Sequence, residues 1–258
     1  MVAIGADNLR PAEIRLEDVS MSFGSRAVLT SFSGSFPAGK ISVILGGSGA
    51  GKSTLLRLIG GLIAPGSGRI KVAESDVVGA NARRLREIRD QVAMLFQGGA
   101  LLDSLNVFDN IALPLREHTP MGTAEISARV HTALESVGLR DVDHLLPGEL
   151  SGGMLRRTAL ARAIVHQPRI LLCDEPFSGL DPISVRRIEQ LLVGLNQKHG
   201  MTILVVSHHI PSTLRMADHV LLFLRDRHVS GSPDQLRARA DPEIHAFFEE
   251  SDPETEPL

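Results

Sequence analysis

The chain has 258 residues, of which 43% are hydrophobic and 22% charged, a composition that suits a protein with a packed core. Its formal net charge of −3 argues against a broad basic face and therefore against nucleic acid as a partner. The single cysteine, Cys173, excludes an intramolecular disulfide. It lies inside an apolar run, which favours a small buried thiol in a reducing compartment.

The sequence predicts neither a secretory signal nor a membrane span. Residues 1–7 lack a basic region followed by an apolar stretch. No run approaches the roughly eighteen apolar residues that a transmembrane helix needs. Any membrane role is therefore expected to come through a partner protein.

Residues 12–45 alternate short apolar runs with turn signals, a spacing typical of antiparallel strands and hairpins. The last run, residues 41–45, is β-branched and predicts a buried strand. Phe23 lies shortly before this strand and could stack on a nucleotide base, because the chain has no Trp and no Tyr for that role. A place in the core is the alternative for this side chain.

Directly after residues 41–45 comes a segment that fits the phosphate-binding pattern G-x-x-x-x-G-K-[ST], and a helical pattern follows it. Glycines let the backbone N–H groups of such a loop point at phosphate oxygens. Lys52 would place a positive charge on the β- and γ-phosphates, and the Ser53 hydroxyl would bind Mg²⁺. A glycine-rich turn without nucleotide is the alternative. The residues of this predicted site are Gly46, Gly47, Ser48, Gly49, Ala50, Gly51, Lys52, Ser53 and Thr54.

The next segment predicts a strand over residues 69–72, a short helix over 85–90 and a strand over 92–96. The second strand ends at Gln97, which two glycines follow; taken alone, it reads as a surface glutamine. Arginines cluster before this strand but alternate with acids, as on a solvated helix surface. They are Arg83, Arg84, Arg86 and Arg89, with Glu87 and Asp90 among them.

From about residue 100 to 165, helical patterns dominate, notably over 107–115 and 124–137. Prolines are expected to break these helices; they are Pro114, Pro120 and Pro147. We interpret this region as a helical subdomain inserted into an α/β core. It leads to Ser151, followed by Gly152 and Gly153, before a helix predicted over 155–166. Ser151 at the helix N-cap would create a second anion site, and a simple cap is the alternative.

Residues 170–173 are apolar and are followed by two acids, Asp174 and Glu175. An apolar run with acid at its carboxyl end suits a parallel strand, because ligands of open α/β sheets gather at that edge. Asp174 can hold Mg²⁺ through water, and Glu175 can orient or deprotonate an attacking water. Two exposed acids after a strand would be the alternative.

Beyond these acids the pattern predicts a turn over 178–182, a helix over 183–199 and a strand over 202–206. The strand is followed by two histidines, His208 and His209, and position alone does not decide which would face a γ-phosphate. A final hairpin and one or two short helices are expected next. Residues 249–258 form an acidic, proline-containing tail that we expect to be mobile.

Taken together, these motifs resemble the nucleotide-binding subunit of an ATP-binding cassette transporter. The resemblance implies a phosphate-loop NTPase core with a parallel sheet, an N-terminal antiparallel β subdomain and the inserted helical subdomain. It implies an ATPase domain over 12–232, followed by a C-terminal helix and acidic tail over 233–258. It also implies ATP and Mg²⁺ as cofactors, with the adenine-stacking position at Phe23 and the switch histidine at His208.

The family further implies that ATP is bound between two subunits. The phosphate loop of one subunit would face Ser151, Gly152 and Gly153 of the other, and Asp181 would communicate across the interface. Glu175 and His208 would act in hydrolysis, while Asp174, Ser53 and Gln97 would hold Mg²⁺ and Gln97 would link the site to a membrane partner. Two positions depart from the family, since Met154 and His209 stand where Gln and Asp are usual.

Within that family, residues 95–101, 106–119 and 150–164 are similar to the ATPase of the Mla-type phospholipid transporters. This resemblance implies a homodimer on the cytoplasmic face of an inner membrane, bound to a permease. An MCE-domain substrate-binding protein and a STAS-domain regulator would complete the system. Another importer cargo is the alternative, and a cassette protein acting on ribosomes or DNA is a remote one, because the chain has neither a second cassette nor a long coiled-coil insertion.

Overall fold

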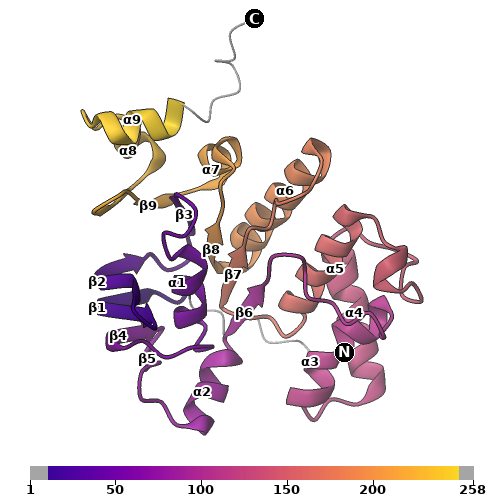
Figure 1. Ribbon diagram of the computed structural model, residues 1–258. Helices are drawn as coiled ribbons and strands as arrows, with labels where there is room; N and C mark the ends of the chain where they lie inside the picture. Colours follow the sequence, from indigo (N-terminus) through magenta and orange to yellow (C-terminus); the bar gives the residue numbers. More distant parts are fainter. Residues whose placement is uncertain (1–10, 250–258) are drawn as a thin grey trace, which may run out of the picture.

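A computed structural model describes residues 11–249 of the chain. The expectations about the first residues and about the acidic tail lie outside this range, apart from the start of the tail. The described residues form two sheets and a group of helices (Figure 1). Among them, no helix is both long enough and apolar enough to pass through a bilayer.

The larger sheet has six strands in the order β10-β9-β3-β8-β7-β6. Its central strands pair in parallel, and β10 closes one edge as an antiparallel hairpin with β9. Strands β3, β7 and β8 are buried along their whole length, which explains why most of their residues are apolar. The bounds are β3 Ile41–Gly46, β6 Val92–Leu95, β7 Ile170–Asp174, β8 Thr202–Val206, β9 His219–Phe223 and β10 His228–Gly231.

The smaller sheet is antiparallel, with the strand order β2-β1-β4-β5. The predicted N-terminal hairpin is confirmed, but the sheet also takes two strands that follow the phosphate loop in sequence. Buried residues of this sheet, of α1 and of one face of the larger sheet form one hydrophobic cluster. The bounds are β1 Ile14–Phe23, β2 Arg26–Phe36, β4 Ser67–Val72 and β5 Ser75–Asp76.

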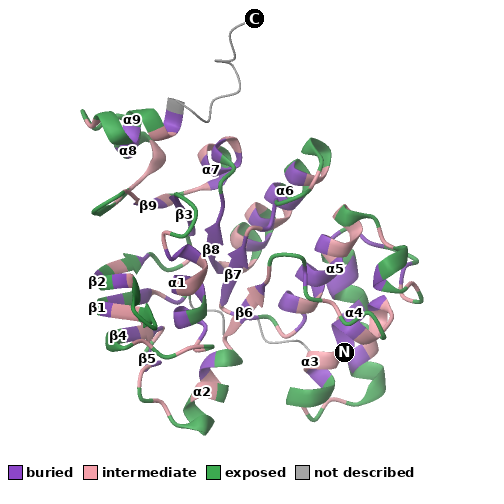
Figure 2. Cartoon of the chain, in the orientation of Figure 1, coloured by how far each residue is buried: buried purple, intermediate pink, exposed green. Residues whose placement is uncertain are grey.

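The other face of the larger sheet packs against most of the helices, which form the second hydrophobic cluster (Figure 2). Cys173 belongs to this cluster, so the prediction of a buried thiol is confirmed, and burial raises its pKa far above the ordinary value. The helices are α1 Lys52–Ile59, α2 Ala82–Arg89, α3 Val107–His118, α4 Thr123–Ser136, α5 Gly152–Ile164, α6 Pro182–His199, α7 Ile210–Met216, α8 Pro233–Arg237 and α9 Pro242–Glu249.

The structure corrects one expectation, because Pro114 does not break a helix. It lies inside α3, which continues to His118. A proline in a helix interior costs about 3 kcal/mol relative to alanine. Ile111 and Leu115 flank it and are fully buried, and burying each such side chain stabilises the fold by about 1.5–3 kcal/mol. Burial on both sides of the proline therefore outweighs its local cost.

Two further differences concern helix ends. Helix α5 begins at Gly152, three residues before the predicted start, and the Ser151 hydroxyl caps it by accepting a bond from the Met154 amide. The sequence patterns gave no helix at α7, whose seven residues follow directly after the two histidines. Helices α8 and α9 confirm the expected short C-terminal helices, and their apolar residues join the second cluster.

Candidate active site

The predicted phosphate loop joins the end of β3 to the start of α1 (Figure 1). Gly46 has a φ of 141° and Gly51 a φ of 90°, a backbone region that favours glycine. Steric contacts also require glycine here, since a Cβ on Gly46 would lie 2.8 Å from the carbonyl oxygen of Phe223. A Cβ on Gly51 would lie 2.9 Å from Cγ1 of Val28. Both ends of the loop are therefore fixed by contacts that exclude larger residues.

Lys52 is buried beneath this loop. Its Nζ atom donates hydrogen bonds to the carbonyl oxygens of Gly46 at 2.7 Å and Gly47 at 2.8 Å. Burial lowers the pKa of the ammonium group, while the carboxylates of Glu175 and Asp174 act to raise it. A phosphate in the loop would give this charge the anionic partner that neutral carbonyls do not supply.

Ser53 and Asp174 meet at the floor of the loop, although 121 positions separate them in sequence. The Ser53 hydroxyl donates a hydrogen bond of 2.8 Å to Oδ1 of Asp174, which ends the buried strand β7. Hydroxyl and carboxylate oxygens are ligands that Mg²⁺ prefers, and Mg²⁺ sites commonly use one or two protein oxygens with substrate phosphates. Within residues 11–249 no three His, Cys, Asp or Glu side chains form a metal cage. The donor set therefore fits Mg²⁺ carried with a nucleotide.

Glu175 follows Asp174 and has a φ of 49°, which is unusual for a residue with a side chain. Its amide donates to the carbonyl of Val206 at 3.0 Å, so the neighbouring strand β8 holds this backbone in place. The Oε1 atom is buried and lacks a well-aligned hydrogen bond. Burial raises the pKa of the carboxyl group, Lys52 opposes this shift and Asp174 adds to it. The site thus offers a buried carboxylate at the end of β7 that could accept a proton, as a water-activating group requires.

The structure separates the roles of the two histidines that sequence left undecided. Nε2 of His208 lies 3.0 Å from Oε1 of Glu175, and burial lowers the pKa of this histidine. His209 instead caps helix α7, because its Nδ1 atom accepts a hydrogen bond of 3.1 Å from the amide of Ser212. His208 is therefore the histidine at the candidate site, and His209 supports the helix that follows it.

Gln97 lies just beyond the end of β6, at the sheet edge where Asp174 ends β7. Its side chain is exposed, and no recorded hydrogen bond of residues 11–249 joins it to Ser53 or Asp174. The segment around it is held from α5, since Arg162 donates to the carbonyl of Gly99 at 2.9 Å. The structure thus places Gln97 at the same sheet edge as Asp174, without a hydrogen bond to Ser53 or Asp174 among the described residues.

Phe23 ends β1 and is 51% exposed, so it is not a core residue. Its partner in the hairpin is Arg26, which the sequence patterns did not identify as part of the site. A Cβ on Gly49 would lie 3.1 Å from Nη2 of Arg26, so this guanidinium lies against the phosphate loop. No local motif marks Arg26, because only the pairing of β1 with β2 brings it to the loop.

The remaining predicted residues form a second group. Asp181 caps α6 by accepting bonds of 3.0 Å from the amides of Ile183 and Ser184, and the Ser184 hydroxyl lies 2.6 Å from its other oxygen. A Cβ on Gly153 would lie 2.7 Å from that hydroxyl oxygen, so the starts of α5 and α6 are in direct contact. Ser151 and Gly152 are exposed next to this contact. None of the recorded hydrogen bonds of the described chain joins this group to the phosphate loop.

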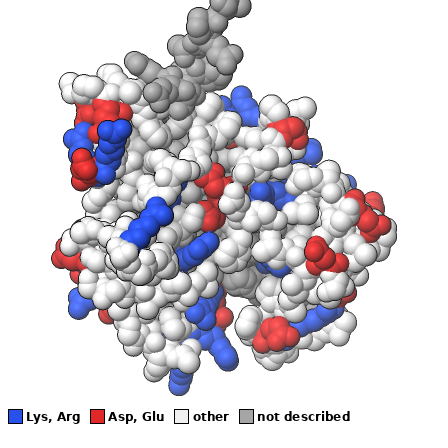
Figure 3. Space-filling view, viewed as in Figure 1, with Lys and Arg blue, Asp and Glu red and all other residues white. Residues whose placement is uncertain are grey.

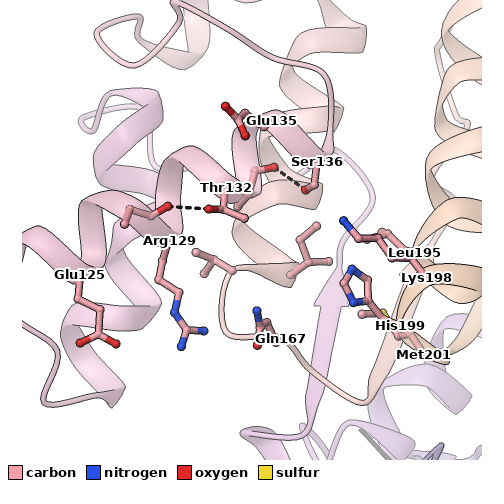
Figure 4. A pocket seen from close by; sticks show the side chains of 14 residues that line it. Glu125, Arg129, Thr132, Glu135, Ser136, Gln167, Leu195, Lys198, His199 and Met201 are labelled. Atoms are coloured by element: carbon pink, nitrogen blue, oxygen red, sulfur yellow. Dashed lines mark hydrogen bonds between the residues drawn. The ribbon is translucent and has the colours of Figure 1, made fainter. Parts of the chain in front are cut away.

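Two hollows lie outside this set of residues. One, of about 690 Å³, is lined by α4 and the carboxyl ends of α5 and α6 (Figure 4). Its lining includes none of the predicted site residues. The hydroxyls of Thr132 and Ser136 turn back to carbonyls of their own helix, as the dashed lines in Figure 4 show. The other polar side chains of its lining are Glu125, Arg129, Glu135, Gln167, Lys198 and His199.

The other hollow, of about 860 Å³, is a groove between α2 on one side and α3 and α5 on the other. It reaches Phe96, the residue before Gln97. Figure 3 shows basic side chains over α2 along this region. The groove has one acidic lining residue, Asp90; its lining arginines are Arg86, Arg89 and Arg162, and its lining histidines are His118 and His166.

A strand, glycine loop and helix around a buried lysine, with carboxylates at the end of a neighbouring strand, define a phosphate-loop nucleotide-binding protein. The family model described as ABC transporter matches residues 29–178. The chain therefore belongs to the ABC transporter family and is an ATPase of that family. The predicted resemblance and the predicted fold class are both confirmed.

Individual relatives support this membership. The chain is 44% identical to the intermembrane phospholipid transport system ATP-binding protein MlaF of Escherichia coli over 92% of this chain and 88% of that protein. It is 39% identical to a probable ribonucleotide transport ATP-binding protein, mkl, of Mycobacterium leprae over 96% of this chain and 72% of that protein. Among solved structures, the dimeric cassette MJ0796 bound to ADP and Pi has a TM-score of 0.76 and 29% identity, covering 84% of this chain and 97% of that one.

Proposed function

We propose that this chain binds and hydrolyses ATP with Mg²⁺ as one half of a homodimer that powers phospholipid transport. The contact between Ser53 and Asp174, with Glu175 next to them, is the observation that carries the catalytic part. Likeness to MlaF over 92% of this chain supports the cargo. The ATPase domain is proposed to span 12–232, with the helical subdomain inserted over about 100–165.

In this proposal Lys52, the loop amides and Arg26 bind the phosphates of ATP, and the exposed ring of Phe23 stacks on adenine. Ser53, Asp174 and Gln97 hold Mg²⁺, which neutralises charge on the phosphates when bound. Glu175 accepts a proton from, or orients, the attacking water through its buried carboxylate. His208 lies within 3.0 Å of that oxygen and faces the same space.

The second copy would complete the site. Among the described residues no hydrogen bond joins the phosphate loop to Ser151 or Asp181, and both lie exposed at the starts of α5 and α6. A helix N-terminus with its cap is suited to an anion, so Ser151, Gly152 and Gly153 would face the ATP bound by the other copy. The ATP-binding cassette MJ0796, which is dimeric and bound to ADP and Pi, supports a dimer of this chain.

The groove beside Gln97 is the proposed docking site for a membrane permease. Its basic lining would complement an acidic segment of that permease. An MCE-domain protein and a STAS-domain regulator are proposed as further partners, and the assembly would place this chain at the cytoplasmic face of an inner membrane. Another cargo is the competing proposal, because mkl is described as a probable ribonucleotide transport protein.

Purification of the tagged Glu175→Gln chain from its native host, after gentle solubilisation of the membranes, tests the partners. We expect a multi-span permease, an MCE-domain protein and bound phospholipid. A permease with a solute-binding protein and no lipid would contradict the cargo, and recovery with ribosomes or DNA would contradict the transporter assignment.

Charge reversal tests the groove in the same experiment. Arg86→Glu should lose the permease, because it places an acid in the basic lining. Arg83→Glu on the same helix is the control, because Arg83 is exposed, pairs with Glu87 and does not line the groove. Equal recovery of the permease with both variants would refute docking at this groove.

A further inference from the structure

Arg156, in the second turn of α5, is a buried arginine held by backbone carbonyls. Its side chain is only 5% exposed. Nη1 donates to the carbonyl oxygen of Phe96 at 3.1 Å, and Nη2 donates to that of Ser178 at 3.3 Å. Burial lowers the pKa of the guanidinium, and none of the ion pairs of residues 11–249 involves it. Such a group is costly to bury unless its hydrogen bonds are geometrically well placed.

The two carbonyls belong to segments with catalytic residues. Phe96 directly precedes Gln97 in the chain. Ser178 lies between Glu175 and Asp181, and its amide donates to the carbonyl of Glu175 at 3.3 Å. One planar guanidinium therefore joins both segments, and its fork fixes the direction of each bond as well as its length.

The first turn of helix α5 also contacts the segment that follows Glu175. A Cβ on Gly152 would lie 3.7 Å from Cδ2 of Leu180, and one on Gly153 would meet the Ser184 hydroxyl. That hydroxyl is bonded to Asp181. The start of α5 is thus packed against the start of α6, and Arg156 joins both to the backbone at Phe96, beside the bond from Arg162 to Gly99.

We infer that Arg156 is a positioning residue of the ATPase reaction, which sets the place of Gln97 relative to Glu175 and Asp181. The inference rests on the proposed function. Arg156 touches none of the phosphate-loop residues in the recorded hydrogen bonds of the described chain, so it acts through the backbone of the two segments. Without it, the pairing of β6 with β7 and the bond from Arg162 to Gly99 would remain, so Gln97 should shift slightly relative to Glu175 while the nucleotide-binding loop stays intact.

Arg157 provides a matched control on the same helix. It donates to the carbonyls of Val137 and Gly138, at 3.3 and 2.8 Å, and to that of Gly153 at 3.3 Å. Its removal costs a similar number of hydrogen bonds to carbonyls. These bonds lie within α5 and its contact with the end of α4, so they do not bridge the two catalytic segments.

The test compares Arg156→Gln, Arg156→Lys and Arg157→Gln in the transporter complex purified from the native host. We expect kcat for ATP to fall at least about tenfold in both Arg156 variants with KM nearly unchanged, because small misplacements of reacting groups cost up to about a hundredfold. Lysine keeps the positive charge but has a shorter side chain without the planar fork of arginine. The midpoint of thermal unfolding should therefore fall less in Arg156→Lys than in Arg156→Gln. Binding of a fluorescent ATP analogue to each isolated full chain should match the wild type.

Wild-type kcat in both Arg156 variants would overturn the inference, and so would an equal fall of kcat in Arg157→Gln. If Arg156→Gln does not fold, Arg156→Lys decides the result alone. A wild-type complex that hydrolyses no ATP would instead refute the proposed function on which the inference rests. The two failures are therefore distinguishable.

Discussion

Replacement of Glu175 by glutamine is the most informative single change at the site. The two side chains have the same shape, and Glu175 is only 15% exposed, so the packing around it should persist. The variant removes the basic oxygen while Lys52, Ser53 and the loop glycines remain. Loss of a positioned general base slows reactions about 10²–10⁴-fold, so we expect hydrolysis to slow at least about a hundredfold, or about 2.7 kcal/mol in the barrier.

The assay measures single-turnover hydrolysis of radiolabelled ATP by the purified complex, together with equilibrium ATP binding. Binding should be retained, because the groups that contact the phosphates are unchanged. Glu135→Gln, an exposed carboxylate on α4, is the control and should hydrolyse ATP at the wild-type rate. Near-normal turnover by Glu175→Gln would remove this residue from the role of base.

The same group sets the expected pH dependence of the wild type. Burial raises the pKa of Glu175 above its ordinary value. A base must be ionised to act, so kcat should fall as the pH is lowered through that raised pKa. The acidic limb of the profile should therefore lie at higher pH than an ordinary glutamate would give. A limb at or below about pH 4.3, the usual value for glutamate, would contradict this account.

Three further outcomes follow from individual contacts. Lys52→Ala should weaken ATP affinity by about tenfold or more in equilibrium binding, since a charge-assisted bond contributes about 1.5–3 kcal/mol, and unchanged affinity would contradict the loop assignment. Gly153→Ala should lower kcat because its Cβ would lie 2.7 Å from the Ser184 hydroxyl, and Ser184→Ala in the same chain should restore part of it. If the two substitutions lowered kcat additively, the result would argue against a contact between Gly153 and Ser184. Pro114→Ala should raise the free energy of unfolding by about 1–3 kcal/mol in denaturant titrations. A free energy of unfolding below that of the wild type would refute our explanation of α3.

Much of the fold was predictable because its central strands are buried on both faces. Strands β3, β7 and β8 carry mostly apolar runs, and each was expected within a residue of its observed bounds. Pro114 was misjudged because local propensity says nothing about burial on both sides of a residue. Helix α7 was missed because it is only seven residues long and begins at a histidine cap that sequence patterns do not mark.

Site residues that belong to a local sequence motif were predictable. Site residues that reach the site only through the pairing of strands or the packing of helices were not. The phosphate loop, Asp174 and Glu175 are local patterns with a chemical reason. Arg26 reaches the loop only through the register of β1 with β2. The importance of Arg156 is visible only from its hydrogen bonds to backbone carbonyls such as that of Phe96. Position alone did not decide between the two histidines; the family resemblance chose His208, and the structure places that residue 3.0 Å from Glu175.

The most direct test of the central claim is ATP-dependent movement of phospholipid by the purified complex in proteoliposomes. We predict that the wild-type chain transfers a fluorescent phospholipid between the transporter and an acceptor membrane only when ATP is hydrolysed, and that the Glu175→Gln complex does not. Normal ATP hydrolysis without phospholipid movement, together with ATP-dependent movement of another solute, would contradict the claim.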